Sequence, residues 1–400
     1  MNVLIVGQNQ TNFGDEAAGI ACAQILLEEE KINRVGIIYR ARNLKFTPLN
    51  IKNSKLYNCG QFGLTISRIY ARILCSIIFV FPIKKFMNLN DEVRNYVALL
   101  ETYNCVIVGP MGADIGKYKN WKLLLEILIA TKKNKKVVFY LDTINKSGDI
   151  IFDLIAKYIL QRSNVFVREK ASKKYLQESG INAKLGIDTA FRLKNLTLKD
   201  IKEKPYITVV MSENIFDWHP DYKKVNINSH SFLKEQLLLP ILKIANFYKL
   251  RVRVINHTTV QEENQRQIEL ISEINNNLKN DNKINYLYVN NAFEYEKAIA
   301  ESKFVVSMRY HGIVLAAKNN VPFLAISYEN KMDEVCRYTN CSECCKNLMS
   351  LVNGKIKIDK ELDILIKNRL LLKNKISMFQ NSKLQKTVYL PLEAIISDEK

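Results

Sequence analysis

The fold is indicated most clearly by residues 304–331, which read FVVSMRYHGIVLAAKNNVPFLAISYENK. Residues 304–308 are a short apolar run with β-branched side chains, which is typical of a buried strand. The apolar segment 313–318 predicts a helix, and Pro322 prevents that helix from continuing. A second apolar run at 323–327 predicts another strand. A strand, a helix and a strand in this order predict a parallel sheet.

Charged residues stand where this strand–helix–strand unit turns. Arg309, His311 and Gly312 lie between the first strand and the helix, and Lys331 follows the second strand. In open α/β sheets ligands bind at the carboxyl ends of the strands. Backbone N–H groups and the helix dipole at that edge favour an anion. We therefore expect Arg309, Gly312 and Lys331 to bind an anionic substrate. A crossover with one incidental histidine is the alternative interpretation.

The composition is that of an ordinary globular protein with a strong basic excess. The chain has 400 residues, of which 48% are hydrophobic and 25% charged, and this length favours two domains. It carries 59 Lys and Arg against 40 Asp and Glu, a formal net charge of +19. That balance favours phosphorylated substrates, anionic membrane surfaces or nucleic acid as partners. The sequence has no zinc-finger spacing and no RNP-like aromatic cluster, so we expect no nucleic-acid partner.

The N-terminus and the cysteines indicate the compartment. The opening MNVLIVG predicts a strand and not a signal peptide, because it has no basic region and no small-residue cleavage site. We therefore expect a cytoplasmic protein. Cysteines cluster at 336, 341, 344 and 345 and include one C-x-x-C. Because no second pair lies at finger spacing and no histidine is adjacent, we expect no metal there.

Residues 62–87 form an unusual apolar and basic stretch. Its apolar centre, 73–83, is too short to span a bilayer and is interrupted by Pro82. The basic residues that flank it are Arg68, Arg72, Lys84 and Lys85. One interpretation places the stretch in a membrane interface. The other, which the sequence favours, is a buried helix with a cationic exposed side.

A second candidate site lies close to the N-terminus. Residues 2–6 predict a strand, and a polar loop leads into a helix near residue 17. Gly14 permits close backbone approach. Asp15 and Glu16 lie in the first helical turn, where the dipole favours acids, which is a sufficient structural reason for both carboxylates. The functional interpretation is a loop that binds a sugar or a phosphate. A dinucleotide is not predicted, because G-x-G-x-x-G is missing.

Two further residues follow predicted strands. Gly112 belongs to a glycine-bearing turn after residues 105–109, which predicts another close backbone approach. Arg168 ends a strand at 165–168 and is expected either to contact the ligand or to serve as an ion-pair partner. The polar, lysine-rich segment 191–205 predicts a linker between a domain 1–195 and a domain 205–400. A long basic helix is expected over 360–383.

The segment SMRYHGIVLAAKNNVPFLAISYENK resembles the signature of the polysaccharide pyruvyl transferase family: Arg-x-His-Gly, an apolar helix, a proline, then a strand ending in Tyr and Lys. Asn12, Gly14, Asp15 and Glu16 match the family's Asn-x-Gly-Asp-Glu opening. The run around Arg168 is also similar to the family pattern.

Two positions depart from the family pattern. The family has a Gly-Gly turn where this chain has Gly109-Pro110 and Gly112. It often carries an arginine after the strand at 206–211, where this chain has Ser212-Glu213-Asn214.

The resemblance implies an α/β fold with two Rossmann-like domains facing a cleft, in a glycosyltransferase-B-like layout. The N-terminal domain is then the acceptor side, and the C-terminal domain carries the donor motif. It also implies a transferase that moves pyruvate from phosphoenolpyruvate onto a sugar of a polysaccharide or its precursor. The product is a cyclic ketal, made in exopolysaccharide or cell-envelope biosynthesis.

For the individual residues, the resemblance makes His311 the expected acid that protonates the enol carbon. Asp15 or Glu16 is the expected base. No metal or redox cofactor is expected, and the acceptor is a sugar or a lipid-linked saccharide, with peripheral contact at the inner membrane face. One rival is a glycosyltransferase that uses a nucleotide-sugar. A second rival is a basic membrane-surface scaffold, in which His311 would be dispensable.

Overall fold

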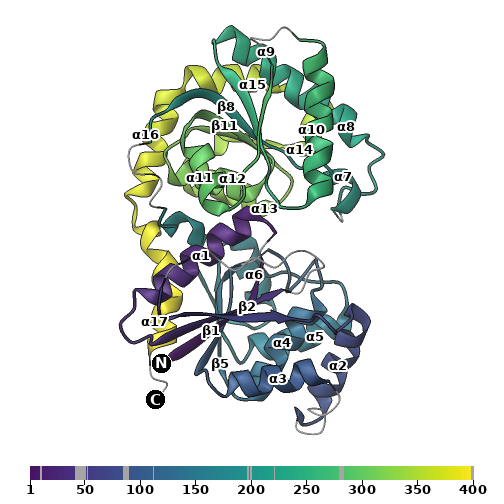
Figure 1. Cartoon of the computed structure of the whole chain (residues 1–400), viewed down its shortest axis with the longest axis vertical. Coiled ribbons are helices and arrows are strands. Elements are labelled where there is room, and N and C mark those ends of the chain that lie inside the picture. Colours follow the sequence, from purple (N-terminus) through teal and green to yellow (C-terminus); the bar gives the residue numbers. More distant parts are fainter. Residues whose placement is uncertain are drawn as a thin grey trace. The chain divides into compact units, whose positions relative to one another are not determined.

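A computed structural model describes residues 1–9, 11–40, 51, 53–83, 90–110, 112–195, 198, 201–219, 221–278 and 283–397 (Figure 1). The chain divides into two compact units. The first comprises residues 1–10, 15–194 and 383–400, and the second comprises residues 11–14 and 195–382. Lys84 and Lys85, which entered the prediction of a basic apolar stretch, lie outside the described residues.

The first unit is built on a seven-stranded sheet in the order β3-β2-β1-β4-β5-β6-β7, and its neighbouring strands are parallel. The strands are β1 (Asn2–Gln8), β2 (Arg34–Arg40), β3 (Leu56–Phe62), β4 (Cys105–Val108), β5 (Lys136–Asp142), β6 (Asn164–Val167) and β7 (Ala183–Leu185). In the central register Leu4 pairs with Gly36 on one side and Val106 on the other. The strand order reverses between β1 and β4, which makes that edge a topological switch point.

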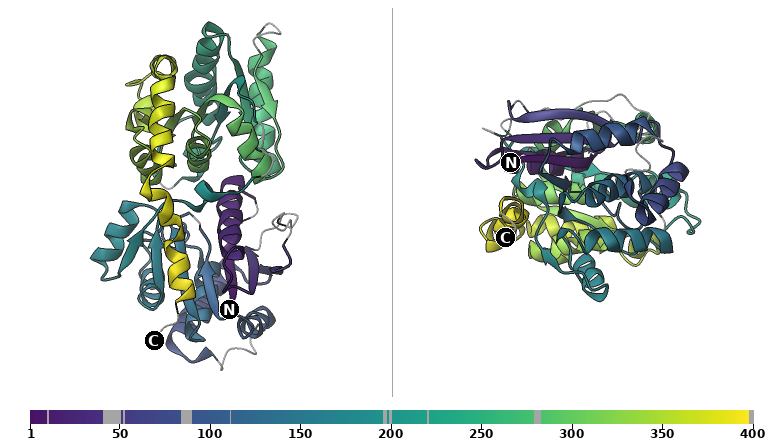
Figure 2. Two further views of the ribbon diagram at one scale, coloured as in Figure 1. Left: turned by 90° about the vertical axis from the view of Figure 1, so that its left-hand side faces the viewer. Right: turned by 90° about the horizontal axis from the view of Figure 1, so that it is seen from below.

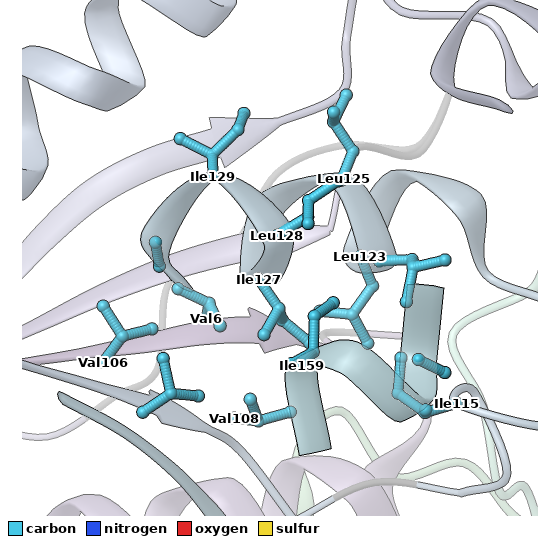
Figure 3. Close-up of a cluster of buried hydrophobic side chains, with 14 of the residues drawn as sticks. Val6, Val106, Val108, Ile115, Leu123, Leu125, Ile127, Leu128, Ile129 and Ile159 are labelled. Atoms are coloured by element: carbon cyan, nitrogen blue, oxygen red, sulfur yellow. The ribbon is translucent and has the colours of Figure 1, made fainter. Parts of the chain in front are cut away.

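Helices cover both faces of this sheet. They are α1 (Phe13–Leu27), α2 (Arg68–Val80), α3 (Asp91–Leu100), α4 (Trp121–Lys132), α5 (Ile150–Leu160), α6 (Lys170–Glu178) and α17 (Leu390–Ile396), with 3-10 turns η2 (Thr189–Arg192) and η7 (Lys383–Tyr389). Figure 3 shows the core on one face, where Val6 and Val108 of the strands meet Ile127 of α4. Phe139 of β5 belongs to this core, and the side chain of the next residue, Tyr140, points to the opposite face of the sheet. There the Tyr140 hydroxyl donates to the Val388 carbonyl at 3.0 Å, so the C-terminal segment packs on that face.

The second unit repeats the same architecture. Its six-stranded parallel sheet has the order β10-β9-β8-β11-β12-β13. The strands are β8 (Lys204–Val210), β9 (Arg251–Ile255), β10 (Asn285–Leu287), β11 (Ser302–Ser307), β12 (Phe323–Ser327) and β13 (Cys345–Asn347). The strand order reverses between β8 and β11, so the second switch point lies there.

Helices of the second unit connect these strands. They are α7 (Ile215–Trp218), α8 (Ser229–Phe232), α9 (Leu239–Phe247), α10 (Gln261–Asn276), α11 (Ala292–Ala300), α12 (Tyr310–Lys318), α13 (Asn330–Tyr338), α14 (Leu348–Val352), α15 (Ile358–Lys367) and α16 (Arg369–Gln380). A π-helical segment, η4 (Leu233–Leu238), precedes α9, and a 3-10 turn, η6 (Ser342–Cys344), precedes β13. The predicted α/β class with two Rossmann-like sheets is confirmed.

The division into units differs from the predicted domain ranges in two segments. Residues 383–400 belong to the first unit, and Figure 2 shows the yellow C-terminal chain leaving α16 and continuing into α17. Residues 11–14 belong to the second unit. There Asn12 forms an antiparallel bridge with Thr258, and the Phe13 N–H donates to the His257 carbonyl at 3.0 Å. Long-range backbone pairing of this kind cannot be predicted from local sequence.

Smaller differences follow from local chemistry. The basic helix expected over 360–383 is wrong as a single element, because Asn368 separates α15 from α16. The strand β3, with the sequence LYNCGQF, was not predicted, since polar residues and a glycine interrupt its apolar pattern. Within the described residues, no helix is long and apolar enough to cross a membrane.

Candidate functional site

Arg309 lies at the switch point of the second sheet. It is the N-cap residue of α12 and follows β11, and its Nε donates to the Met211 carbonyl at the end of β8, 3.2 Å away. Its side chain is only 12% exposed. Carboxylate oxygens of Glu213 and Glu263 lie 3.6 and 3.7 Å from Nη2, which is longer than a hydrogen bond. The guanidinium is therefore buried and positioned, and neither carboxylate forms a close ion pair with it.

His311 lies in the first turn of α12 and is 4% exposed. Its ring packs edge-on against the Tyr310 ring, with centroids 4.9 Å apart. Gly14 lies directly against it: a Cβ atom on Gly14 would lie 2.3 Å from His311 Nδ1. The Gly14 N–H donates to the Asn12 side chain at 2.9 Å, which shapes the loop. Glycine at residue 14 is thus needed for the close approach of this loop to the histidine.

His257 shows the electrostatic character of the site. Its Nδ1 lies 2.9 Å from the Tyr295 hydroxyl. Burial, followed by the charges of Arg309, His311 and Lys331, lowers the pKa of His257 well below its ordinary value. His257 is therefore neutral at physiological pH. The structure places this residue among the cations of the candidate site.

Lys331 reaches the same region from the first turn of α13. Its Nζ pairs with Glu329 at 2.5 Å and lies 5.6 Å from the centre of the Tyr310 ring. Glu329 also contacts the buried His219, whose Nε2 lies 3.2 Å from the second carboxylate oxygen. The sequence offered no role for His219. The structure shows that it supports the acid that holds Lys331.

Glu213 is a functional candidate that the sequence showed only as a departure from the family pattern. It follows β8 at the switch point and is 6% exposed. Its Oε1 accepts no hydrogen bond from any described residue. Burial raises the pKa of Glu213 to about 7, although Arg309 opposes the shift. A carboxyl group with this pKa exchanges a proton near neutrality, and only its place at the strand end could have suggested it.

The remaining predicted residues belong to the first unit. Asp15 accepts a hydrogen bond from Asn9 Nδ2 at 2.8 Å, and Glu16 is its neighbour in the first turn of α1. Arg168 pairs with Asp188 at 2.5 Å, and both side chains are almost completely buried. Gly112 precedes Asp114 in the loop after β4. The second unit therefore gathers Asn12, Gly14, Arg309, His311, Gly312 and Lys331, while Asp15, Glu16, Gly112 and Arg168 lie in the first unit.

The first unit has a pocket of about 310 Å³ near the carboxyl ends of β2, β3 and β4. Its lining residues are Arg40, Phe62, Arg68, Asp114, Tyr118, Lys119, Asn120, Trp121, Lys122, Leu123 and Glu126. The Asp114 carboxylate accepts from Arg40 at 2.5 Å and from Asn120 at 3.1 Å. Glu126 is 3% exposed, and its Oε1 has no hydrogen-bond partner among the described residues. Burial raises the pKa of Glu126 well above its ordinary value, which favours the protonated carboxyl.

A metal site was not expected. Cys336, Cys341 and Cys344 are buried thiols, and Cys345 contacts the Asp333 carboxylate at 3.0 Å. In the part of the chain that the structure describes, His, Cys, Asp and Glu side chains form no group that could hold a metal ion.

Comparison with solved structures shows the same two-domain fold in nucleotide-sugar enzymes. UDP-GlcNAc 2-epimerase from Neisseria meningitidis, bound to UDP-GlcNAc, has a TM-score of 0.62 at 13% identity, with 100% of each chain covered. The S. aureus MnaA–UDP co-structure has a TM-score of 0.60 at 10% identity and covers 99% of this chain and 95% of that one. Anabaena HepE in complex with UDP-glucose has a TM-score of 0.59 at 12% identity, with 99% of each chain covered. At these identities the likeness shows a glycosyltransferase-B-like fold and nothing finer.

A search of curated proteins found no significant match. The family model for polysaccharide pyruvyl transferases, by contrast, matches residues 12–330. That span runs from the Asn12 loop to the start of α13, and it includes the residues around Arg309 and His311 described above. On this evidence the chain belongs to the polysaccharide pyruvyl transferase family.

Proposed function

We propose that this transferase moves pyruvate from phosphoenolpyruvate onto a saccharide and forms a cyclic ketal. One observation carries the proposal: a buried arginine with no close ion pair to Glu213 or Glu263 lies at the second switch point, beside a histidine and a lysine. This combination fits a donor that bears two anionic groups and needs a proton.

The donor's anionic groups match the cations of the second unit. Arg309 can bind a carboxylate or a phosphate through two parallel N–H bonds. The positive end of the α12 dipole adds to the attraction for an anion at this turn, although the Gly312 N–H itself donates to the Arg309 carbonyl at 3.0 Å. Lys331, whose side chain Glu329 holds at 2.5 Å, provides a second positive charge. A proton on Glu213 would remove a negative charge from the vicinity of the donor.

His311 is the proposed general acid. Transfer of its proton to the methylene carbon of phosphoenolpyruvate makes the adjacent carbon electrophilic, and the first acceptor hydroxyl adds there. The second hydroxyl then displaces phosphate, which closes the ketal. Of the two hydroxyl protons, one replaces the proton that His311 gave and the other leaves with phosphate. Asp15 or Glu16 is the proposed base. Because protonation creates the electrophile, the proposed reaction needs no metal or redox cofactor.

The pocket of the first unit is the proposed acceptor site. Its volume of about 310 Å³ lies at the lower end of the range for small-ligand sites. Trp121 and Phe62 supply apolar walls, while Asp114, Asn120 and Glu126 supply partners for hydroxyl groups. That mixture suits a sugar ring better than a purely anionic ligand. A lipid-linked precursor handled on the cytoplasmic side of a membrane is the acceptor class that we propose.

Incubation with phosphoenolpyruvate and a panel of lipid-linked sugars tests the proposal. We expect release of inorganic phosphate together with a product whose mass shows the added ketal. Replacement of His311 by Ala should lower kcat by roughly two to four orders of magnitude, as for other lost acid–base groups. Unchanged kcat in a folded His311→Ala protein would contradict the assignment of the acid. Consumption of a nucleotide-sugar instead of phosphoenolpyruvate would favour a glycosyltransferase.

A further inference from the structure

We propose that α2 and α5 form a docking surface for an anionic lipid bilayer. Seven large apolar side chains of the first unit are exposed there and define what we call the α2–α5 surface: Ile69, Ile73, Val80, Phe81, Ile150, Ile151 and Leu154. Ile69 and Ile150 are 75% and 80% exposed. Isolated apolar side chains on a surface need no explanation, but a group on two neighbouring helices marks an interaction site.

The two helices lie side by side in the first unit (Figure 1). Near their N-termini Arg72 pairs with Asp149 at 3.4 Å. Near their C-termini the Phe79 and Tyr158 rings meet edge-on, with centroids 5.3 Å apart. Because one contact joins the two N-terminal ends and the other joins the two C-terminal ends, the helices are parallel to each other. The exposed apolar side chains of α2 and α5 therefore lie on two neighbouring helices that run side by side.

The structure agrees in part with the interpretation that the sequence favoured for α2, a buried helix with a cationic exposed side, since Arg68 and Arg72 are exposed. The structure does bury one stripe, Ala71, Leu74, Cys75 and Ile78, against the core. The opposite side, however, carries Ile69, Ile73 and Val80 beside the arginines. Helix α2 is thus apolar on two sides, and among the residues that the structure describes only one of these sides is buried in the core.

Charge decides which partner fits this surface. Exposed cations border it at Arg68, Arg72, Lys146, Lys157 and Arg162. Of these cations Arg72 is paired, at 3.4 Å with Asp149, whose other oxygen accepts from the N–H groups of Ile151 and Phe152; Asp153 accepts from the Ser147 N–H. Apolar side chains surrounded by Lys and Arg are the pattern that binds at the interface of an anionic membrane.

A second exposed apolar surface in the chain lacks this charge pattern. On α15 and α16 the exposed side chains are Ile364, Leu370, Leu371 and Met378. The cations between them are paired with acids: Lys367 with Asp363, Arg369 and Lys373 with Glu203, and Lys375 with Glu343. The α15–α16 surface therefore offers little attraction to anionic lipid and serves as the matched control.

The pocket of the first unit adjoins the proposed docking surface. Arg68 lines that pocket, and the next residue, Ile69, belongs to the α2–α5 surface. A bilayer seated on α2 would thus bring lipid head groups close to the pocket mouth. Only this link between the surface and the pocket rests on the proposed acceptor site. The docking surface itself stands on exposure and charge.

Vesicle flotation of the full-length protein tests the docking surface. We expect flotation with vesicles of phosphatidylcholine plus phosphatidylglycerol, and little with phosphatidylcholine alone. The triple variant Ile69→Ser/Ile73→Ser/Leu154→Ser should weaken vesicle binding at least about tenfold, because three exposed apolar side chains can no longer enter the interface. Leu370→Ser/Leu371→Ser, the control, should float like the wild type.

Charge variants and added salt provide a second test of vesicle binding by the same surface. Lys157→Gln/Arg162→Gln should weaken binding to anionic vesicles by about fivefold for each cation removed. Added salt should weaken wild-type binding, because exposed charges are screened over roughly 8 Å at physiological ionic strength. Failure to float at low salt would overturn the proposal, as would equal flotation of the Ser triple variant and the wild type. Sedimentation gives one further outcome. If the wild type is a dimer and the Ser triple variant is a monomer, the α2–α5 surface binds a second copy of the chain instead of a membrane. Each result is independent of whether phosphoenolpyruvate is the donor.

Discussion

Two buried arginines end parallel strands in the two units, and they differ in their partners. Arg168 follows β6 and binds Asp188 at 2.5 Å, with a further bond from Nε to the Thr143 hydroxyl at 3.3 Å. Arg309 follows β11, and the carboxylates of Glu213 and Glu263 stay 3.6 and 3.7 Å away. A strand end therefore does not by itself make an arginine a ligand-binding residue. We expect the guanidinium that lies farther from its neighbouring carboxylates, Arg309, to be the one that takes up a substrate anion.

The largest expected effect concerns the folding role of Arg168. Arg168→Ala leaves the Asp188 carboxylate buried without its cation, which should lower the free energy of unfolding by about 3–5 kcal/mol. Urea denaturation measures this loss. Arg168→Met/Asp188→Asn removes both charges, keeps the side-chain oxygen that accepts from the Ala190 N–H, and should recover much of the stability. Unchanged stability with a raised KM for phosphoenolpyruvate would instead make Arg168 a substrate contact.

A second prediction concerns the close packing that fixes His311. In Gly14→Ala the new Cβ atom would lie only 2.3 Å from His311 Nδ1, so either the imidazole ring or the loop must move. A displacement of about 1 Å at a catalytic group can cost about a hundredfold in rate, and we expect a fall of this order in kcat. Steady-state kinetics, with circular dichroism to verify folding, measure it. A variant with wild-type kcat would show that the contact does not position His311.

Arg309 provides the counterpart to Arg168. Arg309→Ala should weaken the binding of phosphoenolpyruvate by about 1.5–3 kcal/mol, the range for a hydrogen bond to a charged group. Stability should change less than in Arg168→Ala, because no short ion pair to Glu213 or Glu263 is broken. Arg309→Lys keeps the charge without the two-pronged geometry and should recover only part of the affinity. Isothermal titration measures both variants, and equal affinity of all three proteins would remove Arg309 from the donor site.

The smallest expected effect is a pH-dependent one at Glu213. Its folded pKa of about 7 lies above the ordinary value of 4.5, so the folded state holds this proton more tightly than the unfolded state. The stability that Glu213 contributes is therefore complete below pH 4.5 and is lost as the pH rises through 7. Glu213→Gln removes this loss and should stabilise the protein in alkaline buffer by at most about 3 kcal/mol. Melting temperatures across the pH range test it, and a constant difference between the two proteins would contradict the assigned pKa.

Much of the second-unit site could be predicted because its signals are local. The residues of this site lie within one strand–helix–strand unit: Arg309, His311, Gly312 and Lys331. The apolar pattern of that unit and its Pro322 predict where the strands and the helix end, and therefore where these residues lie. Glu213 and Glu263 could not be predicted, because β8 and α10 meet β11 only through sheet pairing and tertiary packing. His257 likewise belongs to this site only through residues that are distant in sequence, Tyr295 and Arg309.

The sequence by itself determined the α/β class, the alternation of strands and helices, and the family motif. Apolar periodicity and turn residues act over a few positions, so these features are visible in the chain. Only the tertiary structure decided which unit holds residues 11–14 and 383–400, which arginine has a close partner, and which side of α2 stays uncovered. The physical reason is that burial and ion pairing depend on groups far apart in sequence, and folding alone brings those groups together.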